Sequence, residues 1–261
     1  AKAKGKIDFV YNGALPFALM LGGTANSDPL EDESPYTWTI TPSGTPIPFT
    51  TSCLMKGTND KRAQIIGCYA KSLSFKMGLN EPVSGTLDIV GKDLDINNPF
   101  TAPTTVAING SKAWKPPELT YSIGSITGIT YITELEFTIS RGVDVGHGLS
   151  ERSPSTSYSG KFDAINGSIT AYVPDSAAAN EIEKLVLGGT STSKKLDAKD
   201  IVIDKSYADE ASDSAKITLS DCIFSDYSTV FPLDTKMSYK FSFSGTSAHV
   251  LWEAPFAKTN W

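Results

Sequence analysis

The chain has 261 residues, 40% of them hydrophobic and 20% charged, which suits one large or two small globular units with cores of their own. Its formal net charge of −6 argues against a protein that grips nucleic acid through a basic surface. Its three cysteines are scattered, which argues against a disulfide framework and a zinc ribbon. No apolar run is long enough for a membrane-spanning helix.

The first predicted elements are a short helix and a two-stranded hairpin. The helix is expected over 15–21, as the smaller counterpart of a helix later in the chain. Apolar and polar side chains alternate over 71–77 and again over 83–89, and a period of two is typical of a strand with one buried face. Residues 78–81 supply the turn between these strands, and Pro82 suits the start of the second strand.

A second hairpin and a longer helix are predicted further along the chain. The alternating segment YITELEFTISR (131–141) is expected to pair with LTYSIGSI (119–126) across a Thr-Gly turn. A helix is expected over 176–187, because an Asp-Ser pair can cap its start and a glycine follows its end.

A segment similar to the first hairpin occurs in the second half of the chain. GCYAKSLSFKMGLNEPVSGTLDIVG (67–91) and DCIFSDYSTVFPLDTKMSYKFSFSG (221–245) both have Cys in second place and end on Gly. Cys222 follows Cys68 by 154 residues (222 − 68 = 154). The preceding stretch, 47–68, aligns with 201–222 at the same offset without a gap.

Two shorter sequence motifs occur in the same order in both halves. GKIDF (5–9) matches GKFDA (160–164), and LMLGGT (19–24) matches LVLGGT (185–190). The ordered set predicts a tandem duplication of one mainly β unit, with a short flanking helix in each copy.

Candidate sites for chemistry are weak. His147 lies near Asp144 in a glycine-rich stretch, but no G-x-S-x-G nucleophile elbow accompanies it. Asp93, Asp95 and Asn97 have the spacing of a calcium loop, but Thr104 stands where the bidentate glutamate belongs. Asn-Gly pairs at 109–110 and 166–167 are expected to mark tight turns. No enzyme activity, metal or cofactor is therefore predicted, and an assembly or binding role is favoured.

Three stretches resemble a known family. YTWTITPSGTPIPFT (36–50), GCYAKSLSFKMGLNEPVSGTLDIVGKD (67–93) and EFTISRGVDVGHGLSERSP (136–154) look like the major tail tube proteins of long-tailed viruses of bacteria and archaea. The resemblance implies β-sandwich or barrel units whose long hairpins join around a ring into a continuous β-barrel. The rings stack into a tube, and the viral genome passes through its lumen into the host.

The resemblance and the duplication together imply an assembly. Residues 1–155 are expected to form the first tail-tube unit, with the hairpin at 119–141 assigned to either unit, and residues 156–261 the second. Six units are usual in a ring of this family, so three copies would make a pseudo-six-fold homotrimer. The implied partners are further copies of the chain, the tape measure, tail terminator and tip or baseplate proteins, and viral DNA in transit, but no membrane. Assembly in the host cytoplasm is expected to place the protein in the virion tail.

One face of the hairpin strands must then face the lumen, where polar and acidic groups would repel phosphates and hydroxyl groups with mixed charges would make a weakly adhesive surface. The polar set of alternating residues is expected there: Ser72, Ser74, Lys76, Ser84, Thr86, Asp88, Ser238, Lys240, Ser242 and Ser244.

The alternative is a two-domain β-sandwich adhesin or carbohydrate-binding module. Such a protein would need an exposed aromatic platform, whereas the four tryptophans are scattered. Soluble monomers would favour this alternative, and spontaneous ring or tube formation would exclude it.

Overall fold

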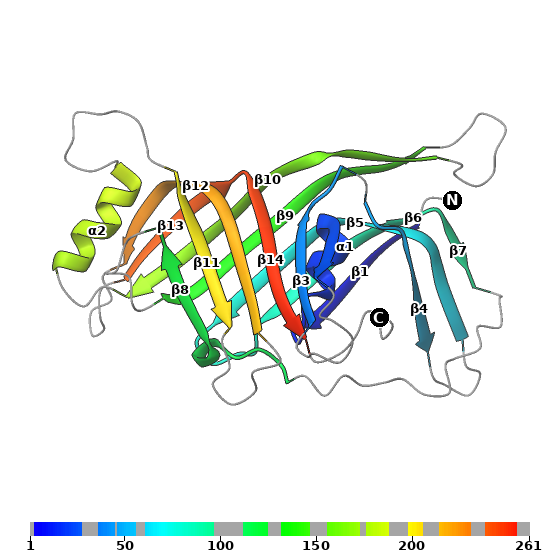
Figure 1. Cartoon of the computed structure of the whole chain (residues 1–261), viewed down its shortest axis with the longest axis horizontal. Coiled ribbons are helices and arrows are strands. Elements are labelled where there is room, and N and C mark those ends of the chain that lie inside the picture. Colours follow the sequence, from blue (N-terminus) through cyan, green and yellow to red (C-terminus); the bar gives the residue numbers. More distant parts are fainter. Residues whose placement is uncertain are drawn as a thin grey trace.

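The structure is a computed structural model that describes residues 3–27, 36–44, 46–55, 61–96, 112–124, 132–146, 156–172, 176–187, 198–205, 214–230 and 238–254. Within these ranges the chain forms 14 strands, two α-helices and one turn of 3₁₀ helix, η1 (Pro116–Glu118) (Figure 1). Most of the described residues lie in strands, so the chain is mainly β, as predicted. All described strand pairs are antiparallel.

Seven neighbouring strands form one broad layer, the main sheet. In spatial order they are β1 (Ala3–Val10), β6 (Ser84–Gly91), β5 (Lys61–Gly78), β9 (Ile132–Gly146), β10 (Thr156–Tyr172), β13 (Ser238–Gly245) and the second half of β12 (Ser214–Val230). The β5–β6 and β12–β13 hairpins predicted from the alternating residues are both present.

Two further layers complete the fold. The cover sheet contains β8 (Leu119–Ile123), β11 (Lys199–Lys205), the first half of β12, β14 (Ser247–Ala254), β3 (Tyr36–Pro42) and β2 (Gly22–Ser27). The short sheet contains β4 (Phe49–Met55), the first half of β5 and β7 (Asp93–Asp95). Figure 1 shows the cover strands β11 and β14 running across the main-sheet strands β9 and β10.

The core lies between the main sheet and the cover sheet. Leu73, Phe75 and Phe137 of the main sheet and Ile217 and Val250 of the cover sheet are all at most 2% exposed. The rings of Phe75 and Phe137, paired across β5 and β9, stack with centroids 4.9 Å apart. Each such side chain contributes about 1.5–3 kcal/mol by leaving water, so one face of every main-sheet strand is fixed in the core.

Both helices begin and end where the sequence predicted. α1 (Leu15–Leu21) contributes Phe17 and Met20 to the core and ends at Gly22, whose φ of 84° is the left-handed conformation favoured by glycine. The longer α2 (Ser176–Leu187) turns Ile182 and Leu185 inward and packs against β12.

Two predictions about local pairing are wrong. The hairpin expected over 119–141 does not form among the described residues, since β8 pairs with β11, and β9 lies between β5 and β10. Asn166 and Gly167 lie inside β10 and not in a turn. Gly167 is needed there because a Cβ atom would lie 2.5 Å from the backbone oxygen of Glu136. The pair at 109–110 lies outside the described residues.

Several local contacts recur at the 154-residue offset. Gly67 and Asp221 both have left-handed φ angles, of 60° and 53°, where β5 and β12 pass from one layer to another. The N–H of Lys92 donates to the oxygen of Ile66 (3.0 Å), and the N–H of Thr246 donates to that of Ser220 (3.1 Å). These matching corners are the local geometry that two copies of one unit would share.

The same comparison corrects the alignment of the two halves. Phe49 of β4 pairs with Cys68, whereas Lys199 of β11 pairs with Cys222, so these strands are offset by 150 residues (199 − 49 = 150), and the ungapped alignment of 47–68 is wrong. Gly5 pairs with Ile89 and Gly167 with Phe243, so GKIDF corresponds in register to GSITA and not to GKFDA.

Candidate functional site: the polar face of the main sheet

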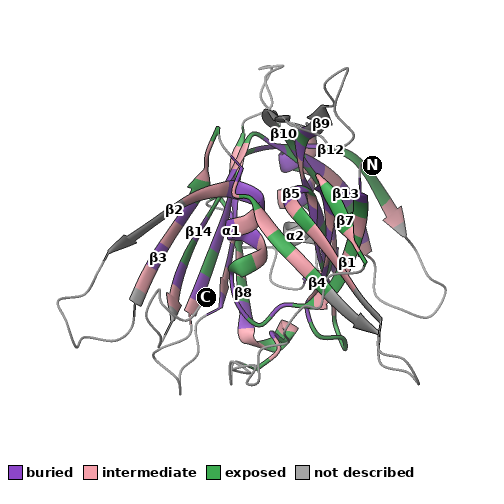
Figure 2. Cartoon of the chain, turned by 90° about the vertical axis from the view of Figure 1, so that its right-hand side faces the viewer, coloured by how far each residue is buried: buried purple, intermediate pink, exposed green. Residues whose placement is uncertain are grey.

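The predicted polar residues lie on one face of the main sheet, opposite the core. Each of the ten is exposed or half-buried, whereas the residues that alternate with them along β5, β6 and β13 are buried (Figure 2). The strands hold this face in register, with Ser74 beside Thr86 on β5 and β6, and Ser242 between Ser168 and Ser225 on β10 and β12.

Three more strands contribute to the same face, and they were absent from the predicted set. β1 adds Lys4, Lys6 and Asp8, β9 adds Glu134, Glu136, Thr138 and Ser140, and β10 adds Asn166, Ser168 and Thr170. The signal was present in the sequence, because Lys4, Lys6 and Asp8 alternate with Gly5, Ile7 and Phe9.

Hydroxyl groups hold the carboxylates of this face from neighbouring strands. The Thr86 hydroxyl donates to Asp8 (2.7 Å), and the Ser72 hydroxyl donates to Asp88 (2.7 Å). On the other side of β9, the Ser168 hydroxyl donates to Glu136 (2.9 Å). One oxygen of each of these three carboxylates is therefore engaged within the sheet.

The charges of this face balance. Among the residues in regular register, Lys4, Lys6, Lys76 and Lys240 stand against Asp8, Asp88, Glu134 and Glu136. Lys6 is paired in register with Asp88, and Lys76 with Glu136. In this set lysines and carboxylates are equal in number, so the face carries hydroxyl groups and mixed charges.

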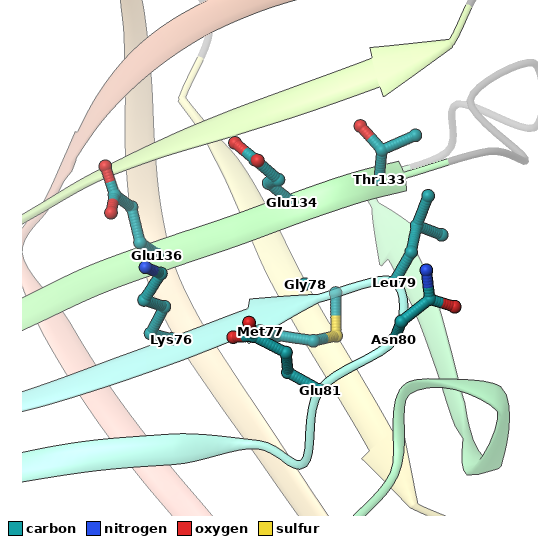
Figure 3. Close-up of a pocket in the computed structure, with 9 residues that line it drawn as sticks. All are labelled: Lys76, Met77, Gly78, Leu79, Asn80, Glu81, Thr133, Glu134 and Glu136. Atoms are coloured by element: carbon teal, nitrogen blue, oxygen red, sulfur yellow. The ribbon is translucent and has the colours of Figure 1, made fainter.

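A groove lies at one end of this face. It is lined by the end of β5, the turn that follows and the start of β9, with Lys76, Met77, Gly78, Leu79, Asn80, Glu81, Thr133, Glu134 and Glu136 (Figure 3). Leu79 stands at its edge with 59% of its surface exposed. We call it the rim groove.

Other candidate sites are not assembled by the structure. Asp93 and Asp95 lie on β7, while Asn97, Thr104 and His147 fall outside the described residues. In the described ranges, no group of three His, Cys, Asp or Glu side chains is placed to hold a metal ion. None of the described helices is long and apolar enough to cross a membrane.

The buried thiols are also poor candidates for chemistry. Cys68 and Cys222 are both free and buried. Burial raises the pKa of Cys68 and raises that of Cys222 to about 12, so both stay protonated at neutral pH.

A broad antiparallel sheet with one face in the core and one neutral, hydroxyl-rich face defines a structural β-sandwich subunit. The chain matches the model of the phage tail tube protein family over residues 2–247 and belongs to that family. A search among curated proteins found no match. The protein is a structural component of the viral tail tube. Trp38, Trp114 and Trp252 are at most 3% exposed, so they supply no aromatic platform for the alternative of a carbohydrate-binding module.

Proposed function

We propose that three copies of the chain close into a pseudo-six-fold ring, that the main sheets form its wall, and that their polar face lines the lumen. The observation that carries this proposal is a polar face that runs across the main sheet, with the core on the other side. In the two outer strands, the exposed apolar residues Val10 and Ile223 lie in register with this face. A neutral surface of hydroxyl groups and paired charges offers passing DNA few fixed cations to bind.

The ring is built from two units in each chain, 1–155 and 156–261. In the first unit β1, β6 and β5 lie side by side, and in the second β10, β13 and β12 lie in the same order. The recurring corners at Gly67 and Asp221 support this division. β9 joins the two units by pairing with β5 on one side and β10 on the other.

Ring closure uses the two outer strands of the main sheet. These are β1 and the second half of β12. Neighbouring strands of the sheet alternate in direction, so the first and the seventh strand run in the same direction. Closing the ring brings β12 of one chain beside β1 of the next. Within a chain, β9 lies between β5 of the first unit and β10 of the second. No described strand follows β12 in the same way, so the junction between two chains, the seam, is expected to be weaker than the junction between the two units of one chain.

The remaining parts of the proposal follow from the tail tube role. The role is structural and not catalytic. The stacked rings conduct viral DNA into the host and contact the tape measure, terminator and tip or baseplate proteins. The subunits are made and assembled in the host cytoplasm.

Cysteine labelling tests which face lines the lumen. Ser74→Cys and Ser242→Cys place thiols on the polar face, and His249→Cys places one at an exposed position of the cover sheet. A maleimide too bulky to enter the lumen is expected to label His249→Cys in intact tubes and to label the other two only after dissociation. Equal labelling of all three in intact tubes would show that the polar face is outside.

A further inference from the structure

The short sheet of the first unit repeats part of the cover sheet of the second. β7 pairs Leu94 with Ile65 of β5, and β14 pairs Ala248 with Leu219 of β12, so both partners recur at the same offset (248 − 94 = 154 and 219 − 65 = 154). β4 completes the match, because it pairs with the first half of β5 as β11 pairs with the first half of β12. The strands β4, β5 and β7 are therefore the counterparts of β11, β12 and β14.

The two counterparts differ in burial. Ala248 and Val250 of β14 are 0% exposed, whereas Leu94 and Ile96, which stand 154 positions earlier, are 49% and 62% exposed. Residues paired across strands point to the same face, and Ile65 packs against the core, so Leu94 and Ile96 lie on the core side of the short sheet. Large apolar side chains that are open where their counterparts are buried indicate a contact surface.

The second unit receives cover for β14 from the first unit. β3 pairs with β14 on the side away from β12, and α1 packs against β14 and β3 as well as against β5 of its own unit. No described strand stands beyond β7 in the place that β3 takes beyond β14. A repeated unit buries its apolar surface against the unit before or after it. Since no unit precedes the first within 1–261, the cover for β7 belongs to a second copy of the chain.

α2 is the counterpart of α1 in the second unit. LMLGGT spans the end of α1 and LVLGGT the end of α2, so Val186 takes the place of Met20. The main contact of α2 is with β12 of its own unit, as α1 packs against β5. Met20 is 0% exposed, whereas Val186 is only half-buried. α2 therefore has apolar surface to offer to a neighbouring chain.

Both surfaces lie at the seam. α2 packs on β12, and the short sheet lies over β1, since a Cβ atom at Gly5 would be 3.3 Å from the Ile65 side chain. Figure 1 shows α2 and β7 at opposite ends of the molecule, so placing β12 beside β1 of the next chain brings α2 to β7. We propose that α2 of each chain packs against the core side of β7 in its neighbour and covers Leu94 and Ile96. The contact joins two different surfaces and closes with the ring, and it rests on the proposed function.

Crosslinking tests the contact directly. Ile96→Cys and Val186→Cys are combined in a Cys53→Ser background, and the assembled protein is treated with a short bis-maleimide. Covalent dimers and trimers are expected on a denaturing gel, because three seams close one ring. Each single variant, and a control that pairs Ile96→Cys with His249→Cys at an exposed position of the cover sheet, is expected to give none. Rings that give no covalent dimers would overturn the proposal, and so would covalent chains longer than three subunits, which would place the contact between rings.

A charged substitution covers the case in which the cysteines disturb assembly. Ile96→Lys places a charge in the proposed contact, and Leu79→Lys places one in the rim groove, away from the seam. Both side chains are exposed in the free subunit, so its melting temperature is expected to stay unchanged. By native mass spectrometry, Ile96→Lys should raise the concentration at which rings form at least tenfold, and Leu79→Lys should leave it unchanged. Equal ring formation by both variants would refute the helix contact and leave the ring standing, whereas wild-type protein that stays monomeric would refute the proposed function.

Discussion

Replacing Lys6 with proline is expected to block ring closure without unfolding the subunit. The N–H of Tyr11 donates to the oxygen of Val83 (2.9 Å), in line with the β1–β6 register. Backbone N–H groups point to alternate sides along a strand, so the N–H of Ile7 points toward β6 and that of Lys6 points toward the open edge. Lys6→Pro therefore removes a donor from the seam and none from the sheet within the chain.

The size of the effect follows from the number of seams. A buried carbonyl left without its donor costs about 1–3 kcal/mol, so each seam is weakened roughly 5- to 150-fold. A ring of three chains has three seams, and closure is disfavoured by about 3–9 kcal/mol in total. The free subunit exposes the same N–H to water, so its own stability should change by less than about 1 kcal/mol.

The assay compares proline with alanine at the same position. Lys6→Ala removes the charge but keeps the N–H, and it is expected to form tubes near the wild-type concentration. Lys6→Pro should raise the critical concentration for sedimentable tubes at least tenfold with an unchanged melting temperature, whereas Ile7→Pro should lower the melting temperature. If Lys6→Pro and Lys6→Ala assembled at the same concentration, β1 would not be the edge that closes the ring.

Three further variants or conditions test the subunit itself. Gly167→Ala should cost about 1–3 kcal/mol of unfolding free energy by chemical denaturation, because its Cβ atom would meet the Glu136 oxygen, whereas Gly78→Ala, with open space around it, should be neutral. Arg141→Met should cost roughly 3 kcal/mol, since carbonyl groups at the end of α1 lose charged donors; an unchanged unfolding midpoint would contradict this. Burial raises the pKa of Cys222 from 9.0 to about 12 in the folded state. Above pH 9 the unfolded chain loses this proton more readily than the folded chain, so the contribution of Cys222 to stability is intact below pH 9 and declines as pH rises toward 12. Stability equal at pH 8 and pH 11 in a comparison of wild type with Cys222→Ala would argue against that burial.

The sequence was most informative where a pattern depends on local burial. The alternation over 71–77 and 83–89 reports which face of a strand is wet, and the structure places those polar residues on one face. The C-terminal ends of both helices were also predictable, because a glycine follows each helix in the sequence.

Strand partners were beyond the reach of the same patterns. The alternation in β9 identifies its two faces but does not distinguish β8 from β5 or β10 as its neighbour. The pairing of Ser74 with Thr138 joins residues far apart in the chain, and it is fixed by the shared core beneath them. The contribution of β9 and β10 to the polar face was missed for that reason.

The recurrence between the two halves of the chain was visible in sequence only where no residues had been inserted. The hairpin keeps one offset from Cys68 to Gly91, but β4 and β11 depart from it by four residues (154 − 150 = 4), a difference that falls in the connections to β5 and β12. Insertions in loops cost little stability, so they can obscure a sequence repeat while local geometry such as the corners at Gly67 and Asp221 is kept.

The most direct test of the account is a reconstruction of the assembled tube by electron cryomicroscopy. Three chains per ring are expected, each supplying the strands from β1 to β12 to a continuous wall, with Ser74, Thr86 and Ser242 facing the lumen. Six chains per ring, or a wall whose polar face points outward, would contradict it.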